Sequence, residues 1–222
     1  MSDPDAAASA ERYDAWYRTP RGCWIGETEY RLLAGALGAR PGETVLDVGC
    51  GTGYFTRLFA ERARARIVGL DPDLAWLRYA RAHAHAGEPC VGGRAERLPF
   101  ADRAFDYAVA VTSLCFVPDQ DAALRELVRV TRKRIALGLL NRRSLLYLQK
   151  GRGGGKGAYR GAHWHTPAEI RAQLAPLPLH DVRLAAAVFL PGGGRVARWV
   201  EERLPPSWLA GAFLLAVADV AA

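Results

Sequence analysis

The fold of this chain is decided by residues 45–55, VLDVGCGTGYF. Four residues read as a buried β-strand, and three alternating glycines follow before a helical pattern begins at Tyr54. Glycine permits a sharp turn and lets a ligand approach the backbone where a Cβ atom would collide. The unpaired N–H groups at the start of the next helix suit a polar or charged ligand.

A second apolar run, IVGLD at residues 67–71, ends on a carboxylate 18 residues after Gly53. In a doubly wound α/β sheet, a carboxylate about 20 residues after the last glycine binds ribose hydroxyls. The two segments therefore predict a site for a nucleoside-containing cofactor. Dinucleotide-binding loops have the spacing G-x-G-x-x-G, whereas this loop has G-x-G-x-G. Asp47 precedes the glycines, and a carboxylate there suits an amino group or a sulfonium better than a pyrophosphate.

At residues 47–53 the chain resembles the class I S-adenosylmethionine-dependent methyltransferases, whose glycine-rich signature is D-x-G-C-G-T-G. Residues 93–106, GRAERLPFADRAFD, are similar to the G-D-A-E-x-L-P-F-x-D-x-x-F-D segment of the type 11 subgroup, which includes ubiquinone and menaquinone methyltransferases. The resemblance is strong over residues 40–131. It implies a Rossmann-like, doubly wound sheet of seven strands in the order 3-2-1-4-5-7-6, with helices on both faces and an antiparallel last strand.

The resemblance also implies which residues bind S-adenosylmethionine. Asp71 would hold the ribose, Pro72 would back the adenine, and the backbone of Ala95 would meet the adenine edge. Arg94 stands where the family often has Asp or Asn, and an arginine cannot accept the hydrogen bond of the adenine amino group. Either Glu96 replaces that contact or it is absent. The full expected set is Tyr13, Asp47, Gly49, Cys50, Gly51, Gly53, Asp71, Pro72, Arg94, Ala95, Glu96 and Thr112.

Strands and helices alternate through the middle of the chain, which predicts βαβ units and a parallel sheet. We expect strands near 44–48, 66–70, 90–92, 105–112 and 134–140, and helices near 54–64, 73–86 and 119–131. Outside this region we expect helices at 9–18, 27–37 and 195–203, a capped helix from Thr166, strands at 181–190 and 212–220, and a flexible glycine-rich loop at 151–157. We interpret residues 1–222 as one domain with four parts: a helical cover (1–38), a cofactor-binding core (40–140), a lid and substrate segment (141–180) and a hairpin-like end (181–222).

Residues that follow the fourth and fifth strands are expected near the transferred methyl group, because ligands of open α/β sheets bind beyond the carboxyl ends of the strands. These are Thr112, Ser113, Phe116 and Asn141. Two aromatic segments, 13–17 and 159–165, are candidates for a lid. The spacing of Tyr13, Trp16 and Tyr17 fits ordinary core packing of a helix equally well. The catalytic residue is not identified, and the candidates are His163, His165 and Tyr17.

The composition indicates a soluble, cytoplasmic protein. The formal net charge is +7, almost all of it from arginine, and no RNA-binding motif accompanies it, so we do not expect nucleic-acid binding. The four cysteines form no C-x-x-C pair, so we expect no disulfide framework and no metal. The first residues do not resemble a signal peptide. The apolar tail from Trp208 is too short to span a membrane, and we expect a buried strand there.

These observations predict an enzyme that transfers a methyl group from S-adenosylmethionine to a small-molecule acceptor by in-line displacement. Two alternatives stay open: a nucleic-acid or protein methyltransferase, suggested by the basic residues at 129–143, and a non-catalytic S-adenosylmethionine-binding regulator, suggested by Arg94. The acceptor, the methylated atom, the use of a general base and the oligomeric state are not determined by the sequence.

Overall fold

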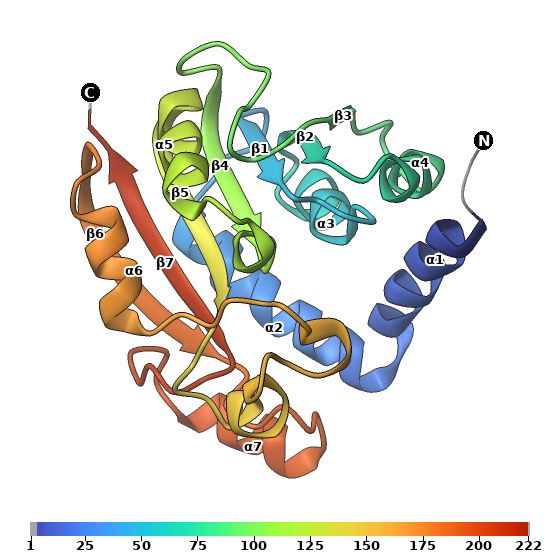
Figure 1. The fold of residues 1–222 in the computed structure, drawn as a ribbon, viewed down its shortest axis with the longest axis vertical. Coiled ribbons are helices and arrows are strands. Elements are labelled where there is room, and N and C mark those ends of the chain that lie inside the picture. The colour runs from blue at the N-terminus through green and yellow to red at the C-terminus, as the bar shows by residue number, and fades with distance from the viewer. Residues whose placement is uncertain (1–3, 222) are drawn as a thin grey trace.

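A computed structural model describes the backbone of residues 4–221 and the side chains of residues 9–221. Its centre is a seven-stranded sheet in the order β3-β2-β1-β4-β5-β7-β6, as the sequence predicts (Figure 1). The strands are β1 (Thr44–Val48), β2 (Arg66–Asp71), β3 (Cys90–Gly92), β4 (Phe105–Val111), β5 (Thr131–Leu140), β6 (Leu179–Ala187) and β7 (Phe213–Val220).

Helices surround this sheet, with α2 behind β5 and with α5 and α6 in front (Figure 1). The α-helices are α1 (Pro4–Arg18), α2 (Pro20–Leu37), α3 (Tyr54–Arg62), α4 (Leu74–Ala82), α5 (Gln120–Val130), α6 (Pro167–Leu174) and α7 (Arg195–Arg203). Shorter turns lie at η1 (Leu114–Phe116), η2 (Tyr147–Gly151, a π-helical turn) and η3 (Gly157–Tyr159).

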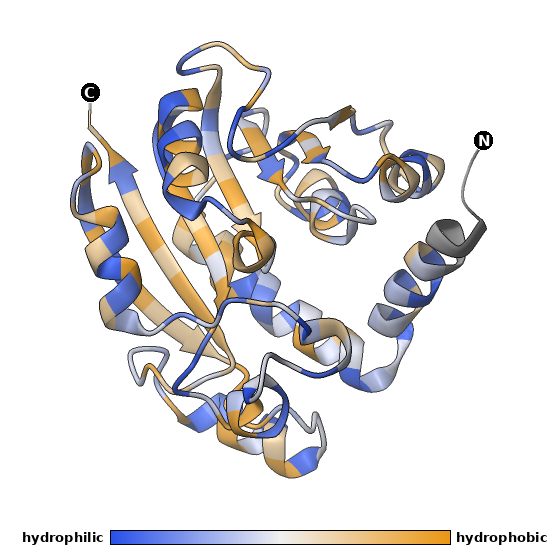
Figure 2. Cartoon of the chain, viewed as in Figure 1, coloured by the Kyte–Doolittle hydropathy of each residue, from blue (hydrophilic) through white to orange (hydrophobic). Residues whose placement is uncertain are grey.

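The first five strands are parallel, and β7 runs antiparallel between β5 and β6. Strands at the centre of such a sheet are covered on both faces, so they require continuous apolar sequence. Figure 2 shows this for β4, β5 and β7, which are largely hydrophobic. Residues 108–111 of β4 are all buried. The parallel order places the carboxyl ends of β1, β2 and β4 side by side.

Helix α2 begins at Pro20, seven residues before the predicted start at 27. Thr19 is its N-cap, because the threonine side chain accepts a hydrogen bond from the Gly22 backbone N–H. Gly22 lies so close to α1 that a Cβ atom there would be 2.0 Å from the carbonyl oxygen of Trp16. The early glycines obscured the helical pattern, although the tight α1–α2 junction requires the one at position 22.

The basic residues between 129 and 134 are bound within the protein. The Arg129 guanidinium donates to the carbonyl oxygens of Leu98 and Phe100 and pairs with Glu126. The three following basic side chains are also paired: Arg132 with Asp106, Lys133 with Glu43 and Asp106, and Arg134 with Asp219. This stretch therefore joins segments of the fold and does not form a free basic surface.

The glycine-rich segment is more ordered than the sequence indicates. It starts in the π-helical turn η2 and passes through η3. Gly151 is buried, and a Cβ atom there would lie 2.2 Å from the Tyr147 ring and 2.9 Å from that of Trp164. The predicted loop is thus held at its first glycine by two aromatic side chains.

Candidate cofactor and acceptor site

The glycine loop joins β1 to α3 and has the backbone conformation that its glycines allow. Gly49, Gly51 and Gly53 all have positive φ, at 75°, 55° and 79°. A Cβ atom on Gly49 would lie 2.2 Å from the Cβ of Ser113, whose hydroxyl donates to the Val48 carbonyl oxygen at 2.6 Å. The residue that follows β4 therefore packs directly on the loop, and only glycine fits at position 49.

Asp71 lies at the end of β2 and joins the glycine loop to the start of α4. One of its carboxylate oxygens accepts from the Gly51 N–H at 2.9 Å, and the other accepts from the Asp73 N–H at 2.8 Å. Burial raises the pKa of this carboxyl, and the two backbone donors oppose the rise. The half-buried carboxylate keeps further lone pairs for a ligand, so its geometry suits a pair of hydroxyl groups.

Asp47 is 1% exposed and lies beneath the same loop. Thr56 of α3 donates to it at 2.7 Å, which is the one hydrogen bond that reaches this carboxyl from the described side chains. Burial raises its pKa to about 7, against the effect of Thr56. A buried carboxylate without a cationic neighbour is stabilised by a positively charged ligand, so Asp47 fits the ammonium or sulfonium group that the sequence predicts.

Helix α1 is joined to the glycine loop through Asp14. Its carboxylate pairs with Arg57 of α3 at 2.5 Å and accepts from the Tyr79 hydroxyl of α4 at 3.3 Å. Arg57 also donates to the carbonyl oxygen of Thr52 within the loop at 2.7 Å. These contacts hold α1 beside the carboxyl ends of β1 and β2.

Aromatic side chains line the space between α1 and the loop. The ring of Trp76 would lie 3.1 Å from a Cβ atom on Gly51, and Tyr13 packs on Trp76 with the ring centroids 5.0 Å apart. The Tyr13 and Tyr17 hydroxyls are 3.3 Å apart, and Tyr17 stacks on Tyr54 at 3.7 Å. Tyr13 and Tyr17 thus both take part in aromatic packing beside the start of α3 and α4. Trp76 was missed because helical spacing alone marks it as ordinary packing.

Cys50 belongs to the glycine loop, but its thiol points into the sheet. A Cβ atom on Gly69 of β2 would lie 2.8 Å from the Cys50 sulfur and 3.5 Å from that of Cys90. The hydrogen bond from Cys50 lowers the pKa of the Cys90 thiol. Both cysteines are unpaired. Only the backbone of Cys50 is therefore placed to meet a ligand, and the proximity of the two thiols was not predicted.

The predicted adenine edge is formed by residues after β3 and β2. Arg94 donates to the Glu96 carboxylate at 2.8 Å, and its side chain is 66% exposed. This ion pair engages the Arg94 guanidinium and one oxygen of the Glu96 carboxylate. Ala95 between them is buried, and Pro72 is exposed at the end of β2.

Thr112 follows β4 with a positive φ of 52° and donates its N–H to the Gly138 carbonyl oxygen at 2.7 Å. This left-handed conformation is uncommon for a β-branched residue and turns the chain toward the glycine loop at Ser113. Phe116 is 50% exposed on the turn that follows.

One predicted neighbour of the methyl group, Asn141, and one catalytic candidate, His165, are buried and hydrogen-bonded to other parts of the chain. Asn141 is fully buried, and its amide donates to the carbonyl oxygens of Leu209 and Gly211. His165 is also fully buried, with Nε2 2.9 Å from Gln120 Oε1. Burial lowers the pKa of His165 to about 4, so the ring is neutral. Its neighbour His163 is exposed, with the ring centroids 4.5 Å apart. Asn141 and His165 thus form hydrogen bonds that connect separate segments of the chain.

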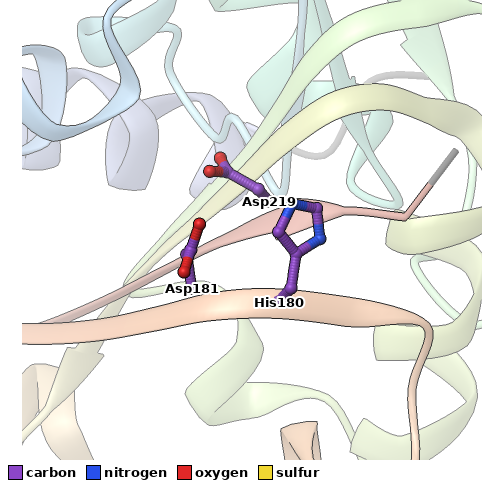
Figure 3. A group of neighbouring side chains, drawn as sticks. All are labelled: His180, Asp181 and Asp219. Atoms are coloured by element: carbon purple, nitrogen blue, oxygen red, sulfur yellow. The ribbon is translucent and has the colours of Figure 1, made fainter.

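One group of potential metal ligands occurs among the described residues, far from this site in the sheet. His180, Asp181 and Asp219 gather where β6 meets the end of β7 (Figure 3). Asp219 already pairs with Arg134 at the opposite ends of the parallel strands. The same end of the sheet carries a polar hollow of about 480 Å³, lined in part by Arg40, Glu43 and Lys133. Among the described residues, no helix is long and apolar enough to cross a membrane.

Comparison with known proteins agrees with this geometry. A family model described as a methyltransferase domain, of the type 11 group, matches residues 46–136. An uncharacterized protein of Mycobacterium tuberculosis is 32% identical over 223 aligned positions, which cover 97% of this chain and 73% of that protein. The malonyl-[acyl-carrier protein] O-methyltransferase of Serratia marcescens is 35% identical over 183 positions, or 82% of this chain and 64% of that enzyme.

The fold is shared with solved structures. A Thermotoga maritima S-adenosylmethionine-dependent enzyme, named as a possible histamine N-methyltransferase, superposes with a TM-score of 0.77 over 96% of both chains at 22% identity. At that identity the likeness concerns the fold alone. Since the family model covers the glycine loop and Asp71, and related sequences extend over nearly all of the remainder, this chain belongs to the type 11 class I S-adenosylmethionine-dependent methyltransferases.

Proposed function

We propose that this enzyme transfers a methyl group from S-adenosylmethionine to a small-molecule acceptor by in-line displacement. The observation that carries the proposal is the joined unit of the glycine loop and Asp71, in which the Gly51 N–H is bound by the carboxylate at the end of β2. That unit lies at the carboxyl ends of adjacent parallel strands, where open α/β sheets bind their ligands.

The residues of this unit fit the cofactor group by group. We assign the methionine part to the loop of Gly49, Cys50, Gly51 and Gly53, where positive φ angles and absent side chains leave the backbone accessible. Asp47 faces the positive charges. These assignments follow from the chemistry of the side chains, because a cation stabilises the ionised form of a buried carboxyl.

The nucleoside part is assigned to the next two strands. Asp71 would hold the ribose hydroxyls, while Pro72 and the Ala95 backbone would enclose the adenine. The Arg94–Glu96 ion pair would border the adenine without donating to it. Thr112 turns the chain toward the methionine end, and Tyr13 covers the cofactor from α1.

The bound cofactor would supply a methyl group on a sulfonium. That methyl group is already electrophilic, so the protein does not need to activate it. The protein has to align the acceptor with that methyl group and exclude water. Such alignment offsets about 7–11 kcal/mol of an activation barrier. The contacts of Asp14 and the packing of Tyr13 on Trp76 hold α1 where it performs this task.

A general base is required only for an acceptor that is protonated at neutral pH, where it contributes about 10²–10⁴-fold. Tyr17 lies among the aromatic side chains of this site, and burial raises its pKa well above the usual value. A tyrosine with a raised pKa keeps its proton at neutral pH and so is not available to accept one. We therefore assign Tyr17 to positioning and leave His163, which is exposed, as the remaining candidate base.

The alternative of a nucleic-acid methyltransferase depended on the basic stretch, whose side chains at 129 and 132–134 are bound to carboxylates of the same chain. A small acceptor agrees with relatives named as demethylmenaquinone methyltransferase, such as that of Streptomyces avermitilis at 40% identity over 46% of this chain. The unpaired cysteines suit a reducing compartment, so we propose that the reaction takes place in the cytoplasm.

The test is titration calorimetry with S-adenosylhomocysteine, followed by turnover assays with small acceptors and labelled S-adenosylmethionine. We expect micromolar binding and transfer of label to a small acceptor. A folded protein that does not bind the compound contradicts the proposed function. Binding without turnover on any acceptor favours a regulator, and label on transfer RNA favours the nucleic-acid alternative.

A further inference from the structure

Glu29 interrupts the buried stripe of α2. Helix positions four residues apart lie on one face, and the neighbours of Glu29 at that spacing are Ile25 and Leu33, both buried. Carboxylates are rarely placed on such a stripe unless they have a partner. Glu29 is half-buried, and no described side chain or backbone group forms a hydrogen bond or ion pair with its carboxyl. Its carboxyl is therefore free to accept a cationic group from a ligand.

The stripe leads from Glu29 toward the cofactor position through aromatic contacts. Gly26, one turn earlier on α2, lies against the Tyr54 hydroxyl, since a Cβ atom there would be 2.6 Å from it. Tyr54 stacks on Tyr17, and the Tyr17 hydroxyl lies 3.3 Å from that of Tyr13. Tyr13 reaches Trp76 above the glycine loop. Glu29 is thus at the outer end of an aromatic wall whose inner end lies at the cofactor.

Electrostatic effects on pKa values indicate which titratable side chains lie near the Glu29 carboxyl. After burial, the charge of Glu29 is the largest cause that raises the pKa of Tyr159, and it also raises the pKa of Tyr13 and Tyr17. Burial followed by the charge of Glu201 of α7 raises the pKa of Glu29 itself to about 8. Glu201 is already bound by the backbone N–H groups at 188 and 189. The groups around Glu29 are therefore tyrosines and one acid. Two cations act on the same tyrosines, Arg21 on Tyr159 and Arg62 on Tyr54, but neither forms an ion pair with Glu29.

A carboxylate bordered by tyrosine rings is the environment in which proteins bind an ammonium group, because the carboxylate supplies the counter-charge and the ring faces attract the cation. We propose that Glu29 is the specificity-determining residue for the acceptor, and that the acceptor carries a basic nitrogen held between the Glu29 carboxylate and the tyrosines. This inference rests on the proposed function and adds the chemical class of its substrate. It also excludes an acceptor with an anionic group at that position.

The first test compares amines with their hydroxyl counterparts. Calorimetry of the protein saturated with S-adenosylhomocysteine would use a panel of alkyl- and arylalkylamines, such as 2-phenylethylamine, each paired with the matching alcohol. We expect at least one amine to bind about tenfold or more tightly than its alcohol, as for a hydrogen-bonded charge. If every pair binds equally, or if no amine binds better than its alcohol, the proposal is overturned. Failure of S-adenosylhomocysteine itself to bind would instead contradict the proposed function.

The second test uses two glutamates of the same helix. Glu29→Gln keeps the shape of the side chain and removes its charge. Glu27→Gln is the matched control, because Glu27 already has a partner in Arg62. We expect Glu29→Gln to abolish the amine preference while the affinities for the alcohol and for S-adenosylhomocysteine stay within about twofold, and Glu27→Gln to change none of them. An equal loss for amine and alcohol would show a merely structural role and overturn the proposal.

A third readout needs no substitution. A protonated Glu29 must release its proton when it binds an ammonium group, so amine affinity should rise with pH, by up to about tenfold per unit below pH 8. The affinity for the matching alcohol should stay level. Equal pH profiles for amine and alcohol would overturn the proposal.

Discussion

The two sides of the site are built in different ways. The cofactor side comes from residues 45–73, two strands with the turns that follow them, and its contacts are made by backbone groups and two carboxylates. The proposed acceptor side would be assembled from α1, α2, α3, α7 and η3, whose side chains meet only in the folded protein.

The two sides differ in how strongly the local backbone restricts the residue type at each position. A glycine loop has few alternatives, since positive φ angles and close backbone approach exclude other residues. A helix position such as 29 accepts almost any residue, and only the packing around it shows that a carboxylate there is unusual. The cofactor side should therefore respond to substitution with loss of binding, and the acceptor side with changes in selectivity and stability.

The largest effect is expected from Gly49→Ala. The new methyl group would collide with Ser113 in a backbone conformation with positive φ, so S-adenosylhomocysteine affinity should fall about 100-fold or more. Calorimetry measures the loss. Gly35→Ala is the control, because nothing lies within 4 Å of a Cβ atom at that exposed position of α2. It should leave binding intact and raise stability by about 0.5–1 kcal/mol. Similar affinities for both variants would contradict our account of the loop.

A smaller loss is expected from Asp71→Asn. The amide preserves the size of the side chain but replaces one acceptor by a donor, which disturbs either the Gly51 contact or a ribose hydroxyl. The affinity for S-adenosylhomocysteine should fall about 10–100-fold, the range for a hydrogen bond to a charged group. Asp121→Asn, at an exposed position of α5, provides the reference. Unchanged binding in the Asp71 variant would remove this residue from the site.

The pH dependence of cofactor binding tests Asp47. Its pKa is raised to about 7, so the carboxyl is protonated below that pH and ionised above it. Since the ionised form attracts a cationic ligand, S-adenosylhomocysteine should bind up to about tenfold more tightly at pH 8 than at pH 6. Asp47→Asn should bind weakly with a level profile. A level profile in the unsubstituted protein would show that this carboxyl does not contact the cationic group.

The smallest effect concerns the stability of the empty protein. Because the pKa of Glu29 is raised above its unfolded value, its ionisation destabilises the fold as pH rises from about 4.5 through about 8. Glu29→Gln removes this cost, so the melting temperature should rise by about 2–6 °C at pH 9 and change little at pH 5. Glu27→Gln loses the ion pair with Arg62 and should not raise it. A lower melting temperature for Glu29→Gln at pH 9 would show that Glu29 has a stabilising partner.

Several parts of the molecule were predictable because their causes are local. The alternating pattern of strands and helices predicts the parallel sheet, and the capping box of Thr166 and Glu169 marks the start of α6, which the structure confirms. The antiparallel position of β7 came from the family resemblance. The segment of residues 93–106 was recognised by its motif, yet its attachment through Arg129 was not, since that requires α5 to lie beside it.

The sequence by itself determined the cofactor class, because the glycine spacing and the two carboxylates at the strand ends are requirements of backbone geometry and charge. It also determined the parallel sheet, because the period of the hydrophobic pattern and the length of each segment distinguish buried strands from amphipathic helices. Only the tertiary structure decided which polar groups are satisfied. Asn141 and His165 have the residue types of a site but are bonded within loops, whereas Glu29 lies on a helix stripe with no partner. Whether a buried polar group has a partner depends on segments distant in the chain, and no local pattern records that.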